Sequence, residues 1–197
     1  MMKRIFDLVA SFTGFCLLLP VFFIIFLLII ILEGGAPFFT QERVGKSGHR
    51  FRLYKFRTMK PSPKEKEKNF EAGNISRITP LGKILRKTKL DELPQLINVL
   101  KGDMSLVGPR PEVIEWTRFY PEKWEVVHQV RPGITDYASL EFHNEEELLR
   151  KHNDPEQAYR DIVLPRKLAL NIDYVNNRTF FGDIGILFKT IKTIWTA

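Results

Sequence analysis

A long uncharged run near the N-terminus, LVASFTGFCLLLPVFFIIFLLIIIL from Leu8 to Leu32, most restricts what this chain can fold into. As a single helix it is long enough to cross a bilayer hydrocarbon core of about 30 Å. A secretory signal is a poor match, because the run is too long and no small-x-small cleavage site precedes Glu33. We therefore expect a membrane segment.

Basic residues flank this segment on both sides, and a proline interrupts it. Lys3 and Arg4 precede it, and a second basic group follows it: Arg43, Lys46, Arg50, Arg52, Lys55 and Arg57. The positive-inside bias points both flanks to the cytoplasm. Pro20 bends or breaks a helix, and Leu8 to Leu19 would cover roughly 18 Å, about one leaflet. The pattern predicts a re-entrant helix-break-helix with Pro20 at the break. The alternative is one spanning helix kinked at Pro20.

The overall charge indicates anionic partners. The net charge of +7 fits nucleic acid, phosphorylated ligands or a negative membrane surface. We expect no nucleic-acid partner, because no helix-turn-helix or RNA-binding signature is present and the basic residues lie beside the membrane segment. The single cysteine, Cys16, excludes an intramolecular disulfide, and the four histidines lack zinc-site spacing.

We expect two regions: a membrane hairpin at residues 1–35 and a second domain at residues 36–197. Aromatic and β-branched runs within Pro37 to Met59 predict a β-hairpin, and Lys60 to Ser76 resembles a surface loop. Apolar spacing predicts one helix ending near Lys87 and another that ends at Gly102. The expected fold class is therefore α+β, predominantly helical, with a small β-hairpin.

A helical stripe near the C-terminus has two interpretations. Its members recur at helical spacing: Ile184, Leu187, Phe188, Ile191, Ile194 and Trp195. Such a stripe is typical of a core helix, and equally of an amphipathic interfacial helix on a membrane.

Two adjacent carboxylates, Asp91 and Glu92, begin the short apolar stretch LDELPQLINVL. Helix capping explains them as an S/T-x-x-D/E signal that starts at Thr88. Arg86 and Arg110 bracket the pair in sequence, which favours phosphate chemistry instead. Adjacent helical residues project about 100° apart, so the two carboxylates suit separate roles rather than a facing acid/base pair. One can attack phosphorus while the other holds a metal or handles a proton.

These residues resemble the small monotopic polyprenol-phosphate phosphoglycosyl transferases, the PglC-type bacterial sugar transferase family. The matching segments are KRIFD before the hairpin, FFTQERVGKSGHRFRLYKFRTM, ITPLGKILRKTKLDELPQLINVLKGDMSLVGPRPE, VRPGIT, and the region of Tyr174 and Asp183. They occur in the family's order over nearly the whole chain. The chain departs from the family after VRPGIT, where Asp136 to Phe142 replaces the common Gly-x-Ala-Gln.

The resemblance implies an enzyme that transfers a sugar-1-phosphate from a UDP-sugar to undecaprenyl phosphate and releases UMP, with Mg²⁺ as cofactor. It implies that Asp91 is the nucleophile that carries a covalent phosphosugar, and that Glu92 helps with the metal and the acceptor. Asp91 and Glu92 would be the metal ligands. Phosphate binding would fall to five cations: Lys55, Arg57, Arg86, Arg110 and Arg131.

The family also implies a setting. The catalytic domain would face the cytoplasm from the bacterial inner membrane, at the first membrane step of surface glycan or glycoconjugate biosynthesis. Membrane lipids would be contacts, and a homodimer or downstream glycosyltransferases would be partners. The alternative is a non-catalytic membrane-anchored scaffold of a glycan-assembly complex. A scaffold explains the membrane segment and the net charge, but it gives no function to the LDEL and GPRP motifs.

Overall fold

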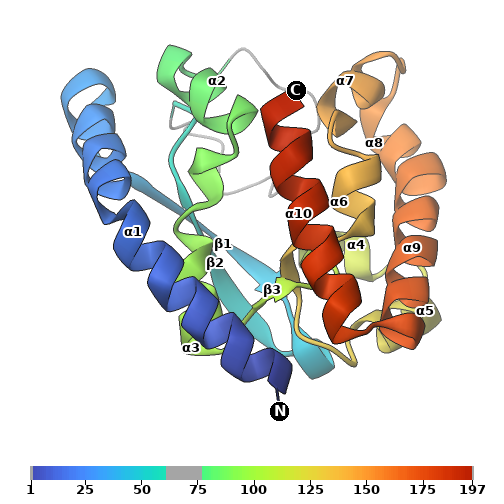
Figure 1. The fold of residues 1–197 in the computed structure, drawn as a ribbon. Coiled ribbons are helices and arrows are strands. Elements are labelled where there is room, and N and C mark those ends of the chain that lie inside the picture. The colour runs from blue at the N-terminus through green and yellow to red at the C-terminus, as the bar shows by residue number, and fades with distance from the viewer. Residues whose placement is uncertain (1, 61–76, 197) are drawn as a thin grey trace.

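The fold places an antiparallel β-hairpin between one long N-terminal helix and a group of shorter helices. The structure is a computed structural model that describes residues 2–60 and 77–196, so the predicted loop at 61–76 lies outside the described residues. The strands β1 (Phe38–Val44) and β2 (Arg50–Phe56) lie in the middle, with α1 (Met2–Glu33) along one side and α9 (Leu164–Asn177) on the other (Figure 1). The predicted α+β, predominantly helical class is confirmed.

The remaining elements are short, apart from the C-terminal helix. In chain order they are η1 (Lys46–Gly48), α2 (Pro80–Lys87), η2 (Leu90–Glu92), α3 (Gln95–Lys101), β3 (Ser105–Val107), α4 (Ile114–Thr117), α5 (Pro121–Val127), β4 (Gly133–Thr135), α6 (Tyr137–Glu141), α7 (Glu145–Arg150), α8 (Pro155–Ala158), the π-helical segment η3 (Tyr159–Val163) and α10 (Phe180–Thr196). The predicted β-hairpin and the helices on either side of Asp91 and Glu92 are therefore present.

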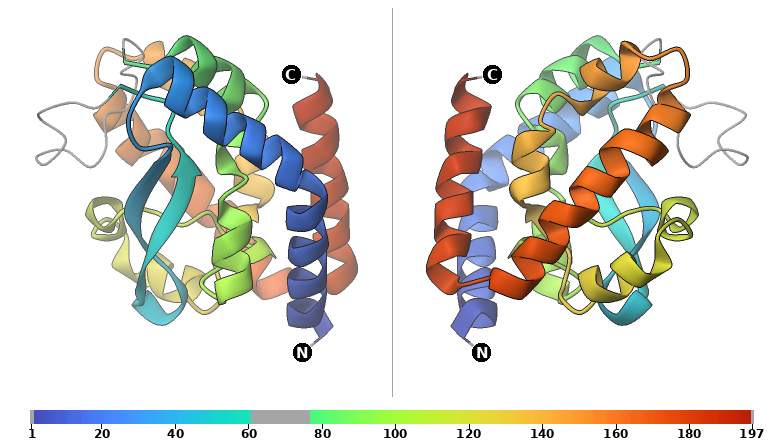
Figure 2. Two further views of the ribbon diagram at one scale, coloured as in Figure 1. Left: turned by 90° about the vertical axis from the view of Figure 1, so that its left-hand side faces the viewer. Right: turned by 90° about the vertical axis from the view of Figure 1, so that its right-hand side faces the viewer.

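The helix α1 runs without interruption through Pro20, and it is bent (Figure 2). Its most apolar part has a mean hydropathy of 3.4, so its length and composition suffice to cross a membrane. The predicted break therefore takes the form of a bend within one helix. The re-entrant topology itself stays a prediction.

Polar side chains in the first turns of α1 bind the rest of the protein. Lys3 Nζ donates to Val107 O at 3.0 Å and lies 2.5 Å from Asp183 Oδ2. Asp7, which is 2% exposed, accepts from Ser105 Oγ at 2.7 Å and from the backbone nitrogen of Leu106 at 3.3 Å. The N-terminal end of α1 is thus held on β3.

The second half of α1 packs on the same domain through apolar contacts. Ile25 and Ile29 are buried in one cluster with Phe56 of β2 and Leu85 of α2. The rings of Phe22 and Phe56 lie 4.7 Å apart. Both ends of the bent helix therefore contact one folded unit, while much of its remaining apolar surface is exposed.

The hairpin is tied to α3 by a buried amide. The backbone nitrogen of Tyr54 donates to Asn98 Oδ1 at 3.0 Å, and Asn98 Nδ2 donates to Arg52 O at 2.7 Å. Asn98 is fully buried, so these bonds satisfy polar groups of β2 that would otherwise be costly to bury. They also fix the position of Lys55, the next residue on the strand after Tyr54.

A second sheet pairs β3 with β4 in parallel, with Ser105 opposite Gly133 and Val107 opposite Thr135. The two chains approach closely, because a Cβ added at Gly133 would lie 2.1 Å from the backbone nitrogen of Gly108. Glycine is therefore required at that crossing. The close contact between Gly108 and Gly133 therefore fixes where the segment Pro109–Pro111 begins.

The C-terminal stripe is largely on the outside of the protein. Phe188, Ile191 and Trp195 are 69%, 57% and 87% exposed, whereas Ile186, which lies outside the predicted stripe, is buried. The other stripe members, Ile184, Leu187 and Ile194, are half-buried, and Leu187 packs on the cluster of Val107 and Ile186, so the core interpretation holds for part of the stripe and is wrong for its exposed half.

Candidate active site

The two carboxylates lie on a short 3₁₀ turn between two helices. Thr88 ends α2, and its Oγ1 donates back to Ile84 O at 2.8 Å. Lys89 is left-handed, with φ of 57°, and turns the chain into η2. Thr88 therefore does not cap a helix that begins near Asp91, so the capping alternative is wrong. Asp91 and Glu92 are nevertheless only 6% and 8% exposed, which places them in a polar site rather than on the surface.

Glu92 binds two cations from different parts of the chain. Arg110 Nη1 donates to its Oε2 at 3.2 Å while Arg110 Nη2 donates to its Oε1, which is the two-pronged pairing typical of arginine and carboxylate. Lys55 Nζ donates to Oε1 at 2.9 Å. Burial opposes ionisation, but Arg110 and Lys55 outweigh it and hold the pKa of Glu92 well below its usual range. Glu92 is therefore a fixed negative charge.

Asp91 is also buried beside Lys55, but its contacts are weaker than those of Glu92. Its Oδ2 lies 3.9 Å from Lys55 Nζ, and its Oδ1 is buried without any hydrogen-bond partner. Burial raises the pKa of Asp91 above its usual value, and Lys55 opposes that rise. One carboxylate of the pair is thus paired and strongly acidic, whereas the other is weakly paired and more basic. Such a split suits separate chemical roles.

Arg110 is held by its backbone as well as by Glu92. Its backbone nitrogen donates to Asp136 Oδ2 at 3.1 Å, and Asp136 also accepts from the backbone nitrogen of Ser139 at 2.6 Å. Asp136 is fully buried. The segment after VRPGIT that departs from the family pattern therefore contributes a group that orients Arg110.

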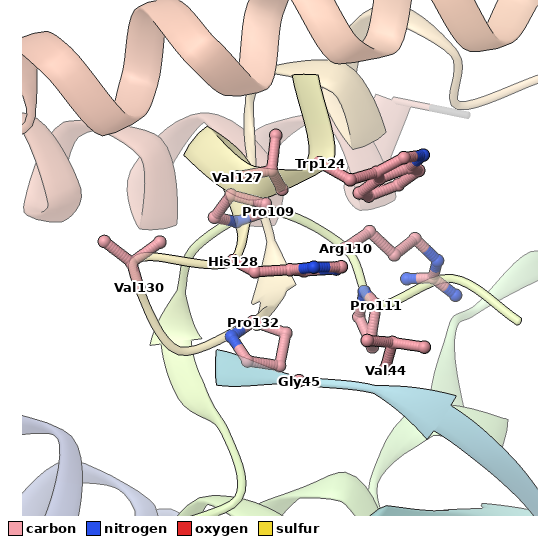
Figure 3. A pocket seen from close by; sticks show the side chains of 10 residues that line it. All are labelled: Val44, Gly45, Pro109, Arg110, Pro111, Trp124, Val127, His128, Val130 and Pro132. Carbon is pink, nitrogen blue, oxygen red and sulfur yellow. The ribbon is translucent and has the colours of Figure 1, made fainter. Parts of the chain in front are cut away.

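A wall of rings and prolines lies beside Arg110 (Figure 3). The rings of Trp124 and His128 are stacked 5.2 Å apart, and the Arg110 side chain points away from Val130. Burial lowers the pKa of His128, so an uncharged imidazole packs there.

The other predicted phosphate-binding cations lie at three different places. Arg86 Nε donates to Thr58 Oγ1 at 2.9 Å, and its charge acts to lower the pKa of Asp91. Arg57 donates to Gly34 O at the end of α1, so it does not share the Lys55 contacts. Arg131 Nε donates to Gly102 O at 2.8 Å, at the opposite end of α3 from the carboxylates. Lys55 and Arg110 contact the carboxylates directly. The phosphate roles of all five cations stay predictions.

Sequence reasoning missed the residues that hold this site in place. Asp7, Asn98 and Asp136 had no assigned role, although each is buried and polar, and burial cannot be read from a single sequence. All three did stand within or directly after the motif segments that carry the resemblance, which was the available signal.

Asp91 and Glu92 could hold a divalent cation only together with oxygen atoms of a bound substrate. Among residues 2–60 and 77–196, no group of three or more His, Cys, Asp or Glu side chains could hold a metal. Mg²⁺ is commonly held by one or two carboxylates together with substrate phosphates. The unpartnered Oδ1 of Asp91 fits that arrangement, whereas both oxygens of Glu92 are already bound by cations.

The raised pKa of Asp91 predicts the acid side of the pH–rate profile. If the Asp91 anion is required, kcat/KM should fall about tenfold per pH unit below a pKa that lies above the ordinary aspartate value. Lys55→Met removes a charge that lowers this pKa, so the fall should begin at higher pH in that variant. The measurement is kcat/KM from about pH 8 to about pH 4.5, with circular dichroism to confirm folding. A profile in Lys55→Met that coincides with the parent's after scaling would contradict the assignment.

The bent apolar helix and the buried carboxylates among cations suit a membrane-associated enzyme of phosphate chemistry. The model of the family described as bacterial sugar transferase matches residues 1–197. The chain therefore belongs to the bacterial sugar transferase family, and the predicted family and enzyme class are confirmed.

Curated relatives match along almost the whole chain. It is 38% identical to the uncharacterized sugar transferase EpsL of Bacillus subtilis, over 98% of this chain and 87% of that protein. It is 36% identical to an Aeromonas hydrophila UDP-N-acetylgalactosamine-undecaprenyl-phosphate N-acetylgalactosaminephosphotransferase, over 99% of this chain. It is 34% identical to the undecaprenyl-phosphate galactose phosphotransferase of Salmonella typhimurium, over 98% of this chain. The chain spans only 44% and 40% of the latter two proteins.

Proposed function

We propose that this protein transfers a sugar-1-phosphate from a UDP-sugar to undecaprenyl phosphate and releases UMP, at the first membrane step of glycan assembly. Similarity to relatives named for sugar-phosphate transfer to undecaprenyl phosphate supports the substrate classes. The observation that carries the proposal is the asymmetric carboxylate pair: Glu92 is neutralised by Lys55 and Arg110, and Asp91 retains an unpartnered oxygen.

The proposed reaction has two displacements at the same phosphorus. An Asp91 carboxylate oxygen attacks the sugar-bearing phosphorus, the bond to the bridging oxygen breaks, and UMP leaves with that oxygen. A phosphate oxygen of undecaprenyl phosphate then attacks, the aspartyl–phosphorus bond breaks, and Asp91 is regenerated. Arg110 and Lys55 lie where they can neutralise the diphosphate, since both already bind an anionic group.

Mg²⁺ is part of this proposal. When bound, it would neutralise diphosphate charge and orient the departing group. Asp91 Oδ1 is the protein atom that suits it best, and Glu92 would have to release a cation in order to join. The proposed phosphate-binding residues are Lys55, Arg57, Arg86, Arg110 and Arg131. Of these, Arg131 binds Gly102 O, at the end of α3 opposite the two carboxylates.

Incubation with a panel of UDP-sugars tests the reaction class. Purified protein, undecaprenyl phosphate and Mg²⁺ should release UMP with at least one donor and with no free sugar-1-phosphate. Activity that persists in Asp91→Asn would favour a different catalytic group. A chain that releases no UMP with any donor would support the scaffold alternative.

The contacts of α1 support the re-entrant topology. Lys3 and Asp7 bind β3 and α10, while Ile25 and Ile29 pack on β2 and α2 of the same domain. A helix that crossed the membrane would separate its ends by about the bilayer thickness and break one of these sets. We propose that both flanks and the catalytic domain lie on the cytoplasmic face of the inner membrane, with the exposed stripe of α10 at the lipid surface.

Cysteine labelling tests that topology. In a Cys16→Ala background, Met2→Cys and Ser47→Cys place thiols at the two flanks, where both native side chains are exposed. A thiol reagent that cannot cross membranes should leave both unlabelled in intact cells and label both after permeabilisation. Labelling of position 2 alone in intact cells would mean that α1 spans the membrane. Pro20→Leu should shift α1 toward that spanning form.

A further inference from the structure

A second buried carboxylate, Glu112, lies outside the Asp91 and Glu92 pair, and the proposed reaction does not use it. It is 8% exposed. Its Oε1 accepts from the Tyr159 hydroxyl at 2.5 Å, and its Oε2 accepts from the backbone nitrogen of Val113 at 3.2 Å and from Arg43 Nη1 at 3.4 Å. Three donors, from β1, from η3 and from the residue that follows Glu112, thus meet at one carboxylate two residues after Arg110.

The same contacts immobilise the backbone that follows Arg110. Arg43 Nη1 also donates to Pro111 O at 3.2 Å, and the backbone nitrogen of Val44 donates to Glu112 O at 3.0 Å. The strand β1 therefore holds both carbonyl groups that follow Arg110. On the other side, the Arg110 backbone nitrogen is bound by Asp136. Only the side chain of Arg110 is left to move between Glu92 and a ligand.

Tyr159 occupies an unusual place on its helix. It begins the π-helical segment Tyr159–Val163 between α8 and α9, and it is 1% exposed. Its ring lies 4.8 Å from that of Trp116, and Lys167 Nζ lies 5.0 Å from the ring centre. π-helical turns are rare and frequently occur at functional sites. Burial and the Glu112 charge raise the pKa of Tyr159 well above its usual value, so its hydroxyl remains a donor at neutral pH.

A purely stabilising ion pair is the competing explanation. Buried ion pairs are weak support for stability, because desolvation offsets most of the attraction, although removal of one partner is strongly destabilising. That explanation predicts that a change in the network affects the whole protein equally, whether or not Arg110 is present.

We propose that Glu112, held by Tyr159 and Arg43, is a positioning residue that sets where the Arg110 guanidinium meets a nucleotide diphosphate. This inference rests on the proposed function for its ligand, a nucleotide diphosphate, and it deepens that function by separating residues that touch the diphosphate from those that orient Arg110. Tyr159 and Arg43 act through Glu112, and Glu112 acts through the backbone of Arg110.

A double-mutant cycle tests the proposal. Tyr159→Phe is made in the parent and in an Arg110→Ala background, and the Kd of UDP with Mg²⁺ is measured by titration calorimetry. We expect UDP binding to weaken about 5- to 20-fold in the parent and less than about 2-fold where Arg110 is absent, because coupled residues give non-additive effects. Equal losses in both backgrounds, or no loss in either, would overturn the proposal.

Two further variants keep the result interpretable. Tyr120→Phe is the matched control, since its hydroxyl donates at 3.4 Å to Arg160 O and does not contact Glu112; it should leave UDP binding unchanged. If Tyr159→Phe does not fold, Glu112→Gln replaces it, because the amide keeps an acceptor for Tyr159 and removes the charge that Arg43 binds. UMP release by the parent from UDP-sugars is measured in parallel: its absence refutes the proposed reaction, whereas the binding cycle alone decides the role of Glu112.

Discussion

Asp91→Asn should reduce UMP release by a factor on the order of 10³ or more, because removal of a covalent nucleophile eliminates the first displacement. The structure strengthens this expectation, since Asp91 carries the free carboxylate oxygen while Glu92 is committed to Lys55 and Arg110. The parent should also show a mass increase of one phosphosugar on the peptide that contains Asp91 when it is quenched with a reactive UDP-sugar. Asp91→Asn should show none.

Asp173→Asn is the matched control for this experiment. Asp173 lies on α9, where it accepts from Asn177 Nδ2 at 2.7 Å. Its replacement should leave both the rate and the adduct unchanged. An adduct that forms on Glu92 instead, or full turnover by Asp91→Asn without deamidation, would sink the assignment of the nucleophile.

Arg110→Lys should be nearly as damaging as Arg110→Ala, each with a loss of about 10²- to 10³-fold in kcat/KM. Lysine keeps the charge but cannot reproduce the fork that already grips both oxygens of Glu92. Steady-state rates for the two variants provide the measurement. Near-normal turnover by Arg110→Lys would show that a point charge at this place is enough.

Arg131→Ala tests whether Arg131 and Arg110 contribute differently to the reaction. Arg131 stands in the VRPGIT segment and shares the predicted phosphate role, but it binds Gly102 O at the far end of α3. We expect a loss of less than about tenfold for this variant. A loss as large as that of Arg110→Ala would place Arg131 in contact with substrate and would require the segment that holds it to move.

The sequence allowed the local features to be predicted and left the long-range ones open. The β-hairpin, α2 and α3 follow from periodicity, and Gly102 ends α3 in the left-handed conformation expected of a terminal glycine. Thr88 misled the capping interpretation because the same residue type can end one helix or begin the next. The direction of its hydroxyl, toward Ile84, and the left-handed conformation of Lys89 distinguish the two.

The resemblance implied that Lys55, Glu92 and Arg110 belong to one site, but the geometry of their contacts was not predictable. It depends on Asn98 pairing with β2 and on the three-residue strands β3 and β4, which are too short to give a periodic signal. The direction of Arg131 was likewise beyond prediction, because motif membership does not specify where a side chain points.

The contact between Asp7 and Ser105 has a consequence for how the protein is made. The two residues are 98 positions apart, so the apolar helix leaves the ribosome long before the strand that satisfies its buried carboxylate. Until then Asp7 must remain hydrated at the lipid headgroups while the residues that follow it enter the bilayer. On the proposed topology, α1 is therefore able to insert before the catalytic fold is complete, and Asp7 pairs with Ser105 of β3 only afterwards. Active protein should then accumulate only when lipid is present during synthesis.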